Sequence, residues 1–420
     1  MQEVALFRLG YGNPLLVVLY YLFGAYLVAT ISGIDGNAAF YGASLVFLWA
    51  SCLLLANRVG SRQKVNLKFL VLCSVLVPLL FFPPWEKQSL YIRFFALEFL
   101  LLFFLFTEFK VSLAAFSRCL NLTYLLYFAL SALNWMGFLP LVPHDSANSF
   151  VITISGFTFE TLYGIGGSTA DIDSYSGLVL MWNLFICRRG RFRVLMVVLS
   201  AAAMLMTFRF TPIVALFGAC LSYFFVSNRF LAMLALSVPA VGFISVLVIL
   251  QINPAGKVPF LAGLDWQSLL WAGTHARSSV WSGQIHYYMT EFGLSDFLYG
   301  PMDERMTVDF IDGEGRFHAK SYNPHNAYLA MLFRSTVMFA LFYGLFFWGV
   351  VRRARRNTFP VLFFISIVAY TNATIVGLQN PAFLLVIFFL LMAVPKGRFK
   401  ETYSLAKRLR APVAVERPAL

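Results

Sequence analysis

Three short polar signals interrupt an otherwise apolar chain and carry the residues that could do chemistry. The first, Thr207-Phe208-Arg209-Phe210-Thr211-Pro212, breaks a long apolar run. The second and third, His275-Ala276-Arg277-Ser278-Ser279-Val280-Trp281 and Ser321-Tyr322-Asn323-Pro324-His325-Asn326-Ala327-Tyr328-Leu329, belong to a polar stretch from about 251 to 326. Arginine binds phosphate oxygens bidentately, and histidine can hold or move a proton near neutral pH. The signals therefore favour chemistry on an anionic substrate.

Arg209 is the sharpest of these candidates. It separates two apolar runs, Val194–Phe208 and Phe210–Phe225, each close to the length that spans a membrane. A charge at such depth is costly, so it usually faces a cavity or a partner. The alternative is an arginine that snorkels to water from a tight outer hairpin.

Arg277 and Trp281 are four residues apart, which places them on one face if the segment is helical. The cation and the aromatic ring could then form one binding surface. The alternative is an ordinary solvated arginine in a loop.

His325 and Asn326 open an apolar helix that we predict over Ala327–Val351, with Tyr328 in its first turn. A helix N-terminus offers unpaired N–H groups that suit a phosphate, and His325 could bind it, position it or move a proton. Alternatively, Asn326 is only a helix cap and His325 a surface residue.

Carboxylates are frequent in the same polar stretch, but no spacing singles out the pair that a glycoside hydrolase needs. We therefore expect most of them to be solvated: Asp296, Asp303, Glu304, Asp309, Asp312 and Glu314. Asp171 and Asp173 lie closer to apolar sequence. They are candidates for binding sugar hydroxyls or for acting as a base.

The composition indicates which kind of fold must position these residues. Of the 420 residues, 60% are hydrophobic and 12% charged, with a mean hydropathy of +0.76, whereas a soluble domain carries roughly 25% charged residues. Apolar runs of about 17–25 residues recur along the chain. We predict an all-α polytopic membrane protein with about twelve transmembrane helices. The net charge of +13 would suggest nucleic acid in a soluble protein, but here the basic residues gather in short loops, as cytoplasmic anchors do.

Every second loop is basic, so both termini are predicted to lie in the cytoplasm. The basic clusters are Arg58–Lys68, Lys110 with Arg118, Arg188–Arg193, Arg229, Arg352–Arg356 and Lys396–Arg410. The stretch of about 252–325 becomes a large periplasmic loop between helices nine and ten. One transmembrane domain covers 1–395, followed by a basic cytoplasmic tail over 396–420.

Two short runs, Tyr175–Cys187 and Phe383–Val394, are the least regular of the predicted helices. The region Phe150–Leu162 is compatible with a re-entrant segment, because its Gly-rich continuation cannot stay helical against lipid. The five cysteines have no spacing typical of disulfides or metal sites, and the chain has neither a P-loop nor a dinucleotide fingerprint. We therefore expect no metal and no cofactor.

Taken in order, the three signals resemble the O-antigen ligase and Wzy-type O-antigen and exopolysaccharide polymerase superfamily. The shared features are a Thr-x-Arg break between helices, an Arg with a Trp four residues later, and a His-Asn-x-Tyr-Leu helix start after a large outer loop. The resemblance covers about 196–344. It departs at Phe208, where that family usually has Ser.

The resemblance implies a GT-C-like helical fold in the bacterial inner membrane and metal-independent, inverting glycosyl transfer on the periplasmic face. It implies a donor glycan on undecaprenyl pyrophosphate, held by Arg209 and Arg277, with His325 as the functional histidine. The acceptor would be lipid A-core for a ligase, towards which the sequence leans, or another lipid-linked repeat for a polymerase. A transporter or flippase of an anionic lipid-linked substrate is the alternative of a different class.

Overall fold

The computed structural model describes part of the chain, and that part is mostly helical. The described residues are 71–74, 76, 80, 87–108, 113–139, 141, 151–154, 156–165, 168–187, 190–225, 293–299, 307–311, 317–321, 326–353, 358–369 and 381–393. The helices are α4 (Lys87–Glu108), α5 (Leu113–Trp135), α6 (Thr169–Phe185), α7 (Arg191–Met206), α8 (Phe210–Phe225), α12 (Leu294–Tyr299), α13 (Ala327–Arg334), α14 (Thr336–Arg353), α15 (Phe359–Ala369) and α16 (Pro381–Phe388), which continues as the π-helix η4 (Phe389–Ala393). Two antiparallel hairpins join β1 (Val151–Ile154) to β2 (Phe157–Glu160) and β3 (Thr307–Ile311) to β4 (Phe317–Ser321).

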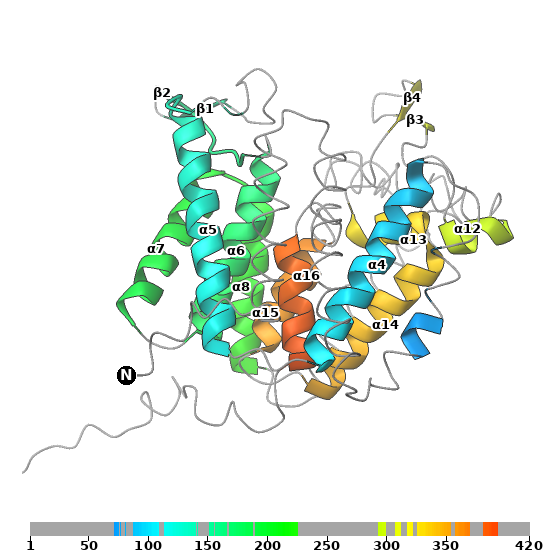
Figure 1. Cartoon of the computed structure of the whole chain (residues 1–420). Helices are drawn as coiled ribbons and strands as arrows, with labels where there is room; N and C mark the ends of the chain where they lie inside the picture. Colours follow the sequence, from blue (N-terminus) through cyan, green and yellow to red (C-terminus); the bar gives the residue numbers. More distant parts are fainter. Residues whose placement is uncertain are drawn as a thin grey trace, which may run out of the picture.

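The long helices form a bundle in which successive helices run in opposite directions (Figure 1). We call the end that carries β1–β2 the hairpin end: α5 and α7 end there, and α6 and α8 begin there. At the opposite end, the basic end, lie the α4–α5, α6–α7 and α14–α15 junctions. Three of the six basic clusters flank these junctions in the sequence: Lys110 with Arg118, Arg188–Arg193 and Arg352–Arg356. Among the described residues, Arg118, Arg191 and Arg193 therefore lie at the end opposite the candidate Arg209.

Hydrogen bonds between buried side chains fix α6 against α5. Asn121 and Asn183 exchange two amide hydrogen bonds, of 3.0 and 2.8 Å, and both are buried. Towards the hairpin end, the hydroxyls of Tyr124 and Ser176 are 2.8 Å apart. Each such contact satisfies polar groups that would be costly to leave unpaired in an apolar interior. The two helices therefore have one defined register, and the start of α6 has one defined position.

The core of the bundle is aromatic and is centred on the last helix. Phe389 of η4 stacks on Phe116 of α5, with ring centroids 4.1 Å apart, and meets Phe106 and Trp182 edge-on. The predicted run Phe383–Val394 therefore corresponds to α16 and η4. Proline fits the first turn of a helix, where its missing N–H is not needed, so the helix begins at Pro381.

The region Phe150–Leu162 forms the hairpin β1–β2, so it is a pair of strands at the hairpin end and not a re-entrant helix. Gly156 closes the two-residue turn with φ of +83°, a conformation that glycine adopts without steric cost. Alternation of β-branched and aromatic residues on either side favours strands.

Two helix boundaries differ from the sequence prediction because of serine caps. α6 begins at Thr169, ahead of the run Tyr175–Cys187, because the Ser168 side chain accepts a hydrogen bond from the Ala170 N–H. The helix predicted over Ala327–Val351 is broken at Ser335, which has extended backbone angles. The Ser335 hydroxyl accepts from the Met338 N–H and so caps the second piece, α14.

Among the described residues, Phe116–Trp135 within α5 is the segment long and apolar enough to cross a membrane by length and composition. Four shorter apolar helices accompany it: Thr211–Phe224, Thr336–Phe346, Phe359–Ala369 and Ala382–Leu391. The large predicted loop is not wholly irregular, since it contains α12 and the β3–β4 hairpin.

Candidate functional site

Arg209 is the last residue of the three-residue turn Thr207–Arg209 between α7 and α8, at the hairpin end. The preceding residue, Phe208, has φ of +51°, the left-handed region that a bulky side chain rarely adopts. Such strain persists only where the surrounding structure holds it, and it is concentrated at functional sites. The turn from α7 into α8, Thr207–Arg209, is therefore conformationally constrained, and we call it the corner.

Three contacts hold this corner in place. The Leu162 N–H donates to the Met206 carbonyl over 3.0 Å, which ties the segment after β2 to the end of α7. The Phe208 ring stacks on Phe159 of β2, with centroids 5.7 Å apart and planes 16° apart. The buried Thr207 hydroxyl donates to the Met204 carbonyl over 2.7 Å. The Phe208 ring is thus one of the contacts that fix the corner.

The Arg209 guanidinium pairs with Asp173 of α6. The Arg209 Nε lies 3.2 Å from Asp173 Oδ2, and the two side chains are 22% and 1% exposed. The Ser174 hydroxyl donates to the other carboxylate oxygen, Asp173 Oδ1, over 2.8 Å. Two residues that the sequence singled out separately thus form one unit. Lone opposite charges within apolar sequence are the signal that could have predicted the pairing, because buried charges are found paired.

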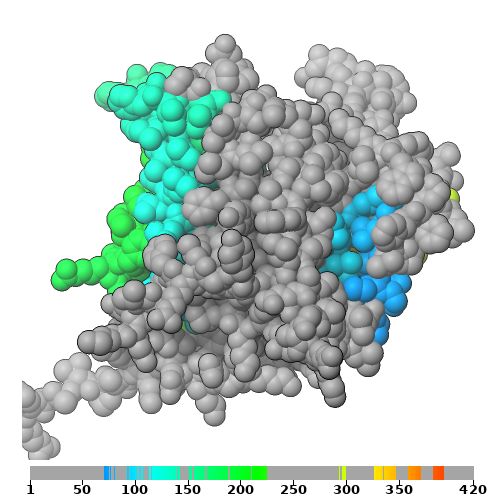
Figure 2. Space-filling model, viewed as in Figure 1, coloured from blue at the N-terminus to red at the C-terminus, as the bar shows by residue number. Residues whose placement is uncertain are grey.

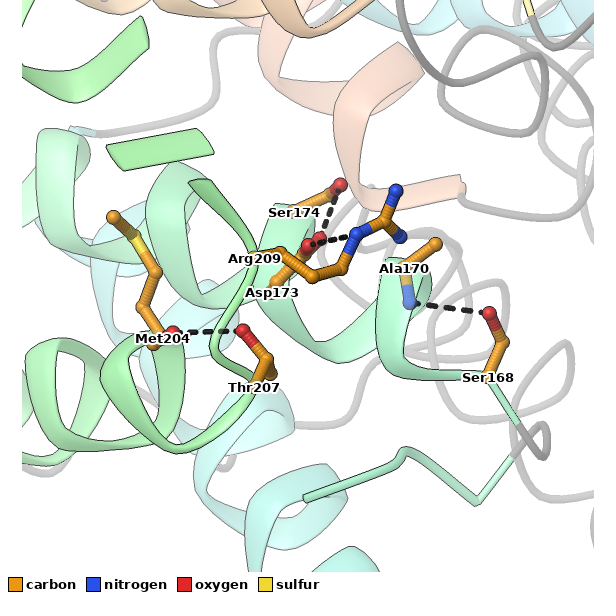
Figure 3. Close-up of polar contacts among 7 residues, drawn as sticks. All are labelled: Ser168, Ala170, Asp173, Ser174, Met204, Thr207 and Arg209. Carbon is orange, nitrogen blue, oxygen red and sulfur yellow. Dashed lines mark hydrogen bonds and ion pairs between the residues drawn. The ribbon is translucent and has the colours of Figure 1, made fainter. Parts of the chain in front are cut away.

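The ion pair leaves the outer part of the guanidinium open. Figure 3 shows that Arg209 approaches Asp173 through Nε while its two terminal nitrogens point away from the carboxylate. Among the described residues, Nε–Asp173 is the only contact of the Arg209 charge. A guanidinium held in this way presents two parallel N–H donors, the geometry that binds a carboxylate or a phosphate bidentately.

The Asp173 carboxyl is poised between its neutral and charged forms. It lies ahead of the apolar run Tyr175–Cys187, near the start of α6. Burial raises the pKa of Asp173 to about 7, although the neighbouring Arg209 guanidinium and the Ser174 hydrogen bond act to lower it. Above that pH the carboxylate is charged and can hold Arg209, and below it the pairing weakens.

Asp171 is partly exposed and lies in the first turn of α6, where a carboxylate interacts favourably with the helix dipole. The nearby segment passes very close to α5: a Cβ on Gly164 would lie 2.0 Å from the Tyr127 hydroxyl oxygen. The Ile165 N–H donates to the Ser131 hydroxyl of α5 over 3.1 Å. These contacts press the 161–165 segment onto α5 and set where α6 starts.

Asn326 is completely buried and caps α13. Its Oδ1 accepts from the N–H groups of Tyr328 and Leu329, at 2.9 and 3.1 Å, and its amide nitrogen is buried with no hydrogen-bond partner among the described residues. The Tyr328 hydroxyl lies 2.8 Å from that of Ser366 in α15. The capping role that the sequence left open for Asn326 is therefore present, and Tyr328 joins α13 to α15.

Three predicted site residues, Arg277, Trp281 and His325, lie outside the described residues. Of the others, the structure brings Arg209 and Asp173 together and places Asp171 two residues before Asp173 on the same helix. Asn326 and Tyr328 belong to the start of α13.

The described residues contain no cluster of three or more His, Cys, Asp or Glu side chains that could hold a metal ion. They do contain Arg209, whose Nε pairs with the buried Asp173 carboxylate and whose terminal nitrogens point away from it. This arrangement is suited to binding an anion. Comparisons of this chain with family models, with curated proteins and with solved structures find no match.

Proposed function

We propose that the chain is a membrane glycosyltransferase that moves a glycan from undecaprenyl pyrophosphate to an acceptor hydroxyl at the hairpin end of the bundle. The acceptor we favour is lipid A-core, as in an O-antigen ligase. A Wzy-type polymerase, in which the acceptor is another lipid-linked repeat, is the alternative within the same chemistry. The observation that carries the proposal is the geometry of Arg209.

A pyrophosphate leaving group requires its developing negative charge to be stabilised by preoriented donors. Arg209 fits this task because Asp173 orients its guanidinium through Nε, while both terminal nitrogens are free of contacts with the described residues. A freely rotating arginine would lose conformational entropy each time it bound the pyrophosphate, and this loss would weaken binding. The strained residue before it and the stacked hairpin support the same role, since they restrict where the guanidinium can point.

The arrangement of the helices supports a membrane location with the site on the outer face. Arg118, Arg191 and Arg193 lie at the end opposite Arg209, and basic loops remain in the cytoplasm. The apolar segment Phe116–Trp135 is of spanning length.

In the proposed reaction the acceptor oxygen attacks the anomeric carbon, and the bond from that carbon to the phosphate oxygen breaks. The electron pair of the broken bond leaves with the pyrophosphate, whose charge Arg209 and Arg277 would stabilise. The acceptor hydroxyl gives up its proton to a base, for which His325 is the candidate because its side chain titrates near neutral pH. Inversion at the anomeric carbon follows from a single displacement.

The proposal is tested by deleting the gene and complementing it with tagged wild-type, Arg209→Ala and Arg193→Ala proteins. Arg193 lies at the basic end of α7, where its guanidinium donates to the carbonyls of Asn183 and Leu184. We expect Arg193→Ala to restore the surface glycan and Arg209→Ala to fail at equal expression. On gels, free lipid-linked polymer in the deletion strain indicates a ligase and single repeats a polymerase. An unchanged glycan pattern contradicts both.

One observation favours the transporter alternative. Glu98 lies in the interior of α4, 1% exposed, and neither carboxylate oxygen has a hydrogen-bond partner among the described residues. Buried ionisable groups inside membrane bundles mark ion pathways and proton relays. A Glu98→Gln variant separates the two functions. If the purified variant still transfers glycan to an added acceptor, the glycosyltransferase proposal is supported. If instead the variant abolishes flux of a lipid-linked substrate across vesicles that contain no acceptor, the chain is a transporter.

A further inference from the structure

We propose that the β1–β2 hairpin is a membrane-interface element whose apolar face lies on the lipid hydrocarbon beside Arg209. The inference rests on the membrane location given under the proposed function, but not on glycosyl transfer. It assigns a partner, the outer-leaflet lipid, to a surface that the catalytic proposal does not use.

The register of the hairpin divides it into two unlike faces. In an antiparallel pair, directly opposite residues point to the same face, and successive residues alternate. One face therefore carries Ile152, Phe157 and Phe159, and the other carries Val151, Thr153, Thr158 and Glu160. The hydroxyls of Thr153 and Thr158 lie 3.2 Å apart, as residues on one face should. The hairpin is thus amphipathic, with its aromatic residues on a single side.

The apolar face is not buried by the described part of the protein. Phe157, next to the turn, is 73% exposed, and Phe159 is exposed except where Phe208 stacks on it. In the space-filling view the hairpin and the end of α5 project from the molecule at the upper left (Figure 2). Contact between this apolar surface and water is unfavourable, so an apolar phase that covers it would stabilise the protein.

The same surface continues along α7. Val194, Val198 and Leu205 are exposed and, spaced by four and seven residues, lie on one stripe of that helix. No charged residue occurs between Arg193 and Arg209, and the helical part of this run, Val194–Met206, is about 20 Å long at 1.5 Å per residue. The stripe reaches the hairpin through Phe208 and Phe159.

Two features favour lipid over a second protein as the cover. An uncharged stripe bounded by an arginine at each end matches a hydrocarbon layer bounded by two headgroup regions. Four exposed phenylalanines, Phe138, Phe157, Phe159 and Phe208, belong to the hairpin end, where an amphipathic element would bury its apolar face at the headgroup boundary. A protein partner would require no such length or end charges.

This placement has a consequence for the anion site. The hairpin ring Phe159 holds Phe208, and Phe208 fixes the corner from which Arg209 projects. A hairpin seated on the hydrocarbon would therefore keep the guanidinium at the level of lipid phosphates. It would select a lipid-linked anion over a soluble one.

The test uses the full chain in lipid nanodiscs, with its five native cysteines, Cys52, Cys73, Cys119, Cys187 and Cys220, replaced by serine or alanine. A nitroxide is attached at Phe157→Cys or, as the matched control on the opposite face, at Thr158→Cys. Collision of each label with oxygen, which concentrates in hydrocarbon, and with a water-soluble nickel chelate is measured by electron paramagnetic resonance. Both positions are exposed, so neither substitution disturbs packing.

We expect the label at 157 to be several-fold less accessible to nickel and more accessible to oxygen than the label at 158. Equal nickel accessibility overturns the proposal, because the hairpin is then in water. Burial of both labels from both reagents also overturns it, because a protein partner then covers the hairpin. Glycan transfer is assayed separately in the same nanodiscs, so a wet hairpin with normal transfer rejects this inference alone.

Discussion

Replacing Arg209 by lysine tests whether the site needs a guanidinium fork or only a positive charge. The lysine ammonium is a compact point charge, whereas arginine carries its terminal N–H groups beyond Nε in a fixed plane. At this position an ammonium can pair with Asp173, 3.2 Å from the present Nε, but it cannot also present two parallel donors to a phosphate. The variant keeps the positive charge and removes the fork geometry, so its activity shows which of the two the site requires.

The magnitude follows from the two donors that are removed. Hydrogen bonds to charged groups contribute about 1.5–3 kcal/mol each, so losing two costs roughly 3 kcal/mol or more. Each 1.4 kcal/mol is about tenfold, which gives at least a hundredfold loss in kcat/KM. Loss of a single oriented donor at a developing anion costs about 10²–10³ in rate, in the same range.

The assay is transfer of glycan from a synthetic undecaprenyl pyrophosphate donor in nanodiscs, with product quantified by mass spectrometry. Arg193→Lys is the matched control, because that arginine contacts only backbone carbonyls of Asn183 and Leu184 among the described residues. We expect it to lose less than severalfold. If Arg209→Lys keeps activity within a few-fold of wild type, the fork reasoning is refuted. If Arg209→Ala does so too, Arg209 is not part of the site.

Three further substitutions probe how the site is positioned. Since burial raises the pKa of Asp173 to about 7 and only the charged carboxylate holds the guanidinium, kcat should fall as the pH drops through 7. Asp173→Asn should lower kcat more than it raises KM, and it should abolish this fall in kcat at low pH. If the fall persists in the variant, another group is responsible for it. Gly164→Ala should lower the Tm sharply because its Cβ would lie 2.0 Å from the Tyr127 hydroxyl, and Tyr127→Phe should recover part of the loss; equal Tm values for the single and double variants contradict the clash. Gly177→Ala places a Cβ 2.3 Å from Phe364 between α6 and α15, so we expect a loss of about 1–3 kcal/mol in unfolding experiments; a wild-type midpoint would show that the two helices can separate at no cost.

Local sequence patterns predicted helices well where an apolar run had a clear boundary. The run Phe210–Phe225 coincides with α8, and Val194–Phe208 with α7 to within three residues. The pattern failed where one side chain redirected the backbone. Ser335 broke a continuous apolar run into two helices because its hydroxyl caps the second, and Gly156 turned a weakly apolar segment into a hairpin.

The candidate site shows the same division. Composition alone makes Arg209 and Asp173 conspicuous, because single charges beside apolar runs are expensive and rarely accidental. Sequence could not show that these two residues, 36 positions apart, share one ion pair, because that depends on how α6 packs against α7. Nor could it show that the paired atom is Nε, with the outer nitrogens pointing away from the Asp173 carboxylate.

The amino-acid sequence by itself determined that apolar helices make up most of the described part of this protein, and which few polar residues stand out. These features depend on side-chain type and on spacing along one segment, which are local properties. Only the tertiary structure decided that Asp173 orients Arg209 and that Phe159 holds the strained Phe208, with Asn326 buried as a cap. Each of these requires contact between atoms or exclusion of water, and both are set by how separate helices pack.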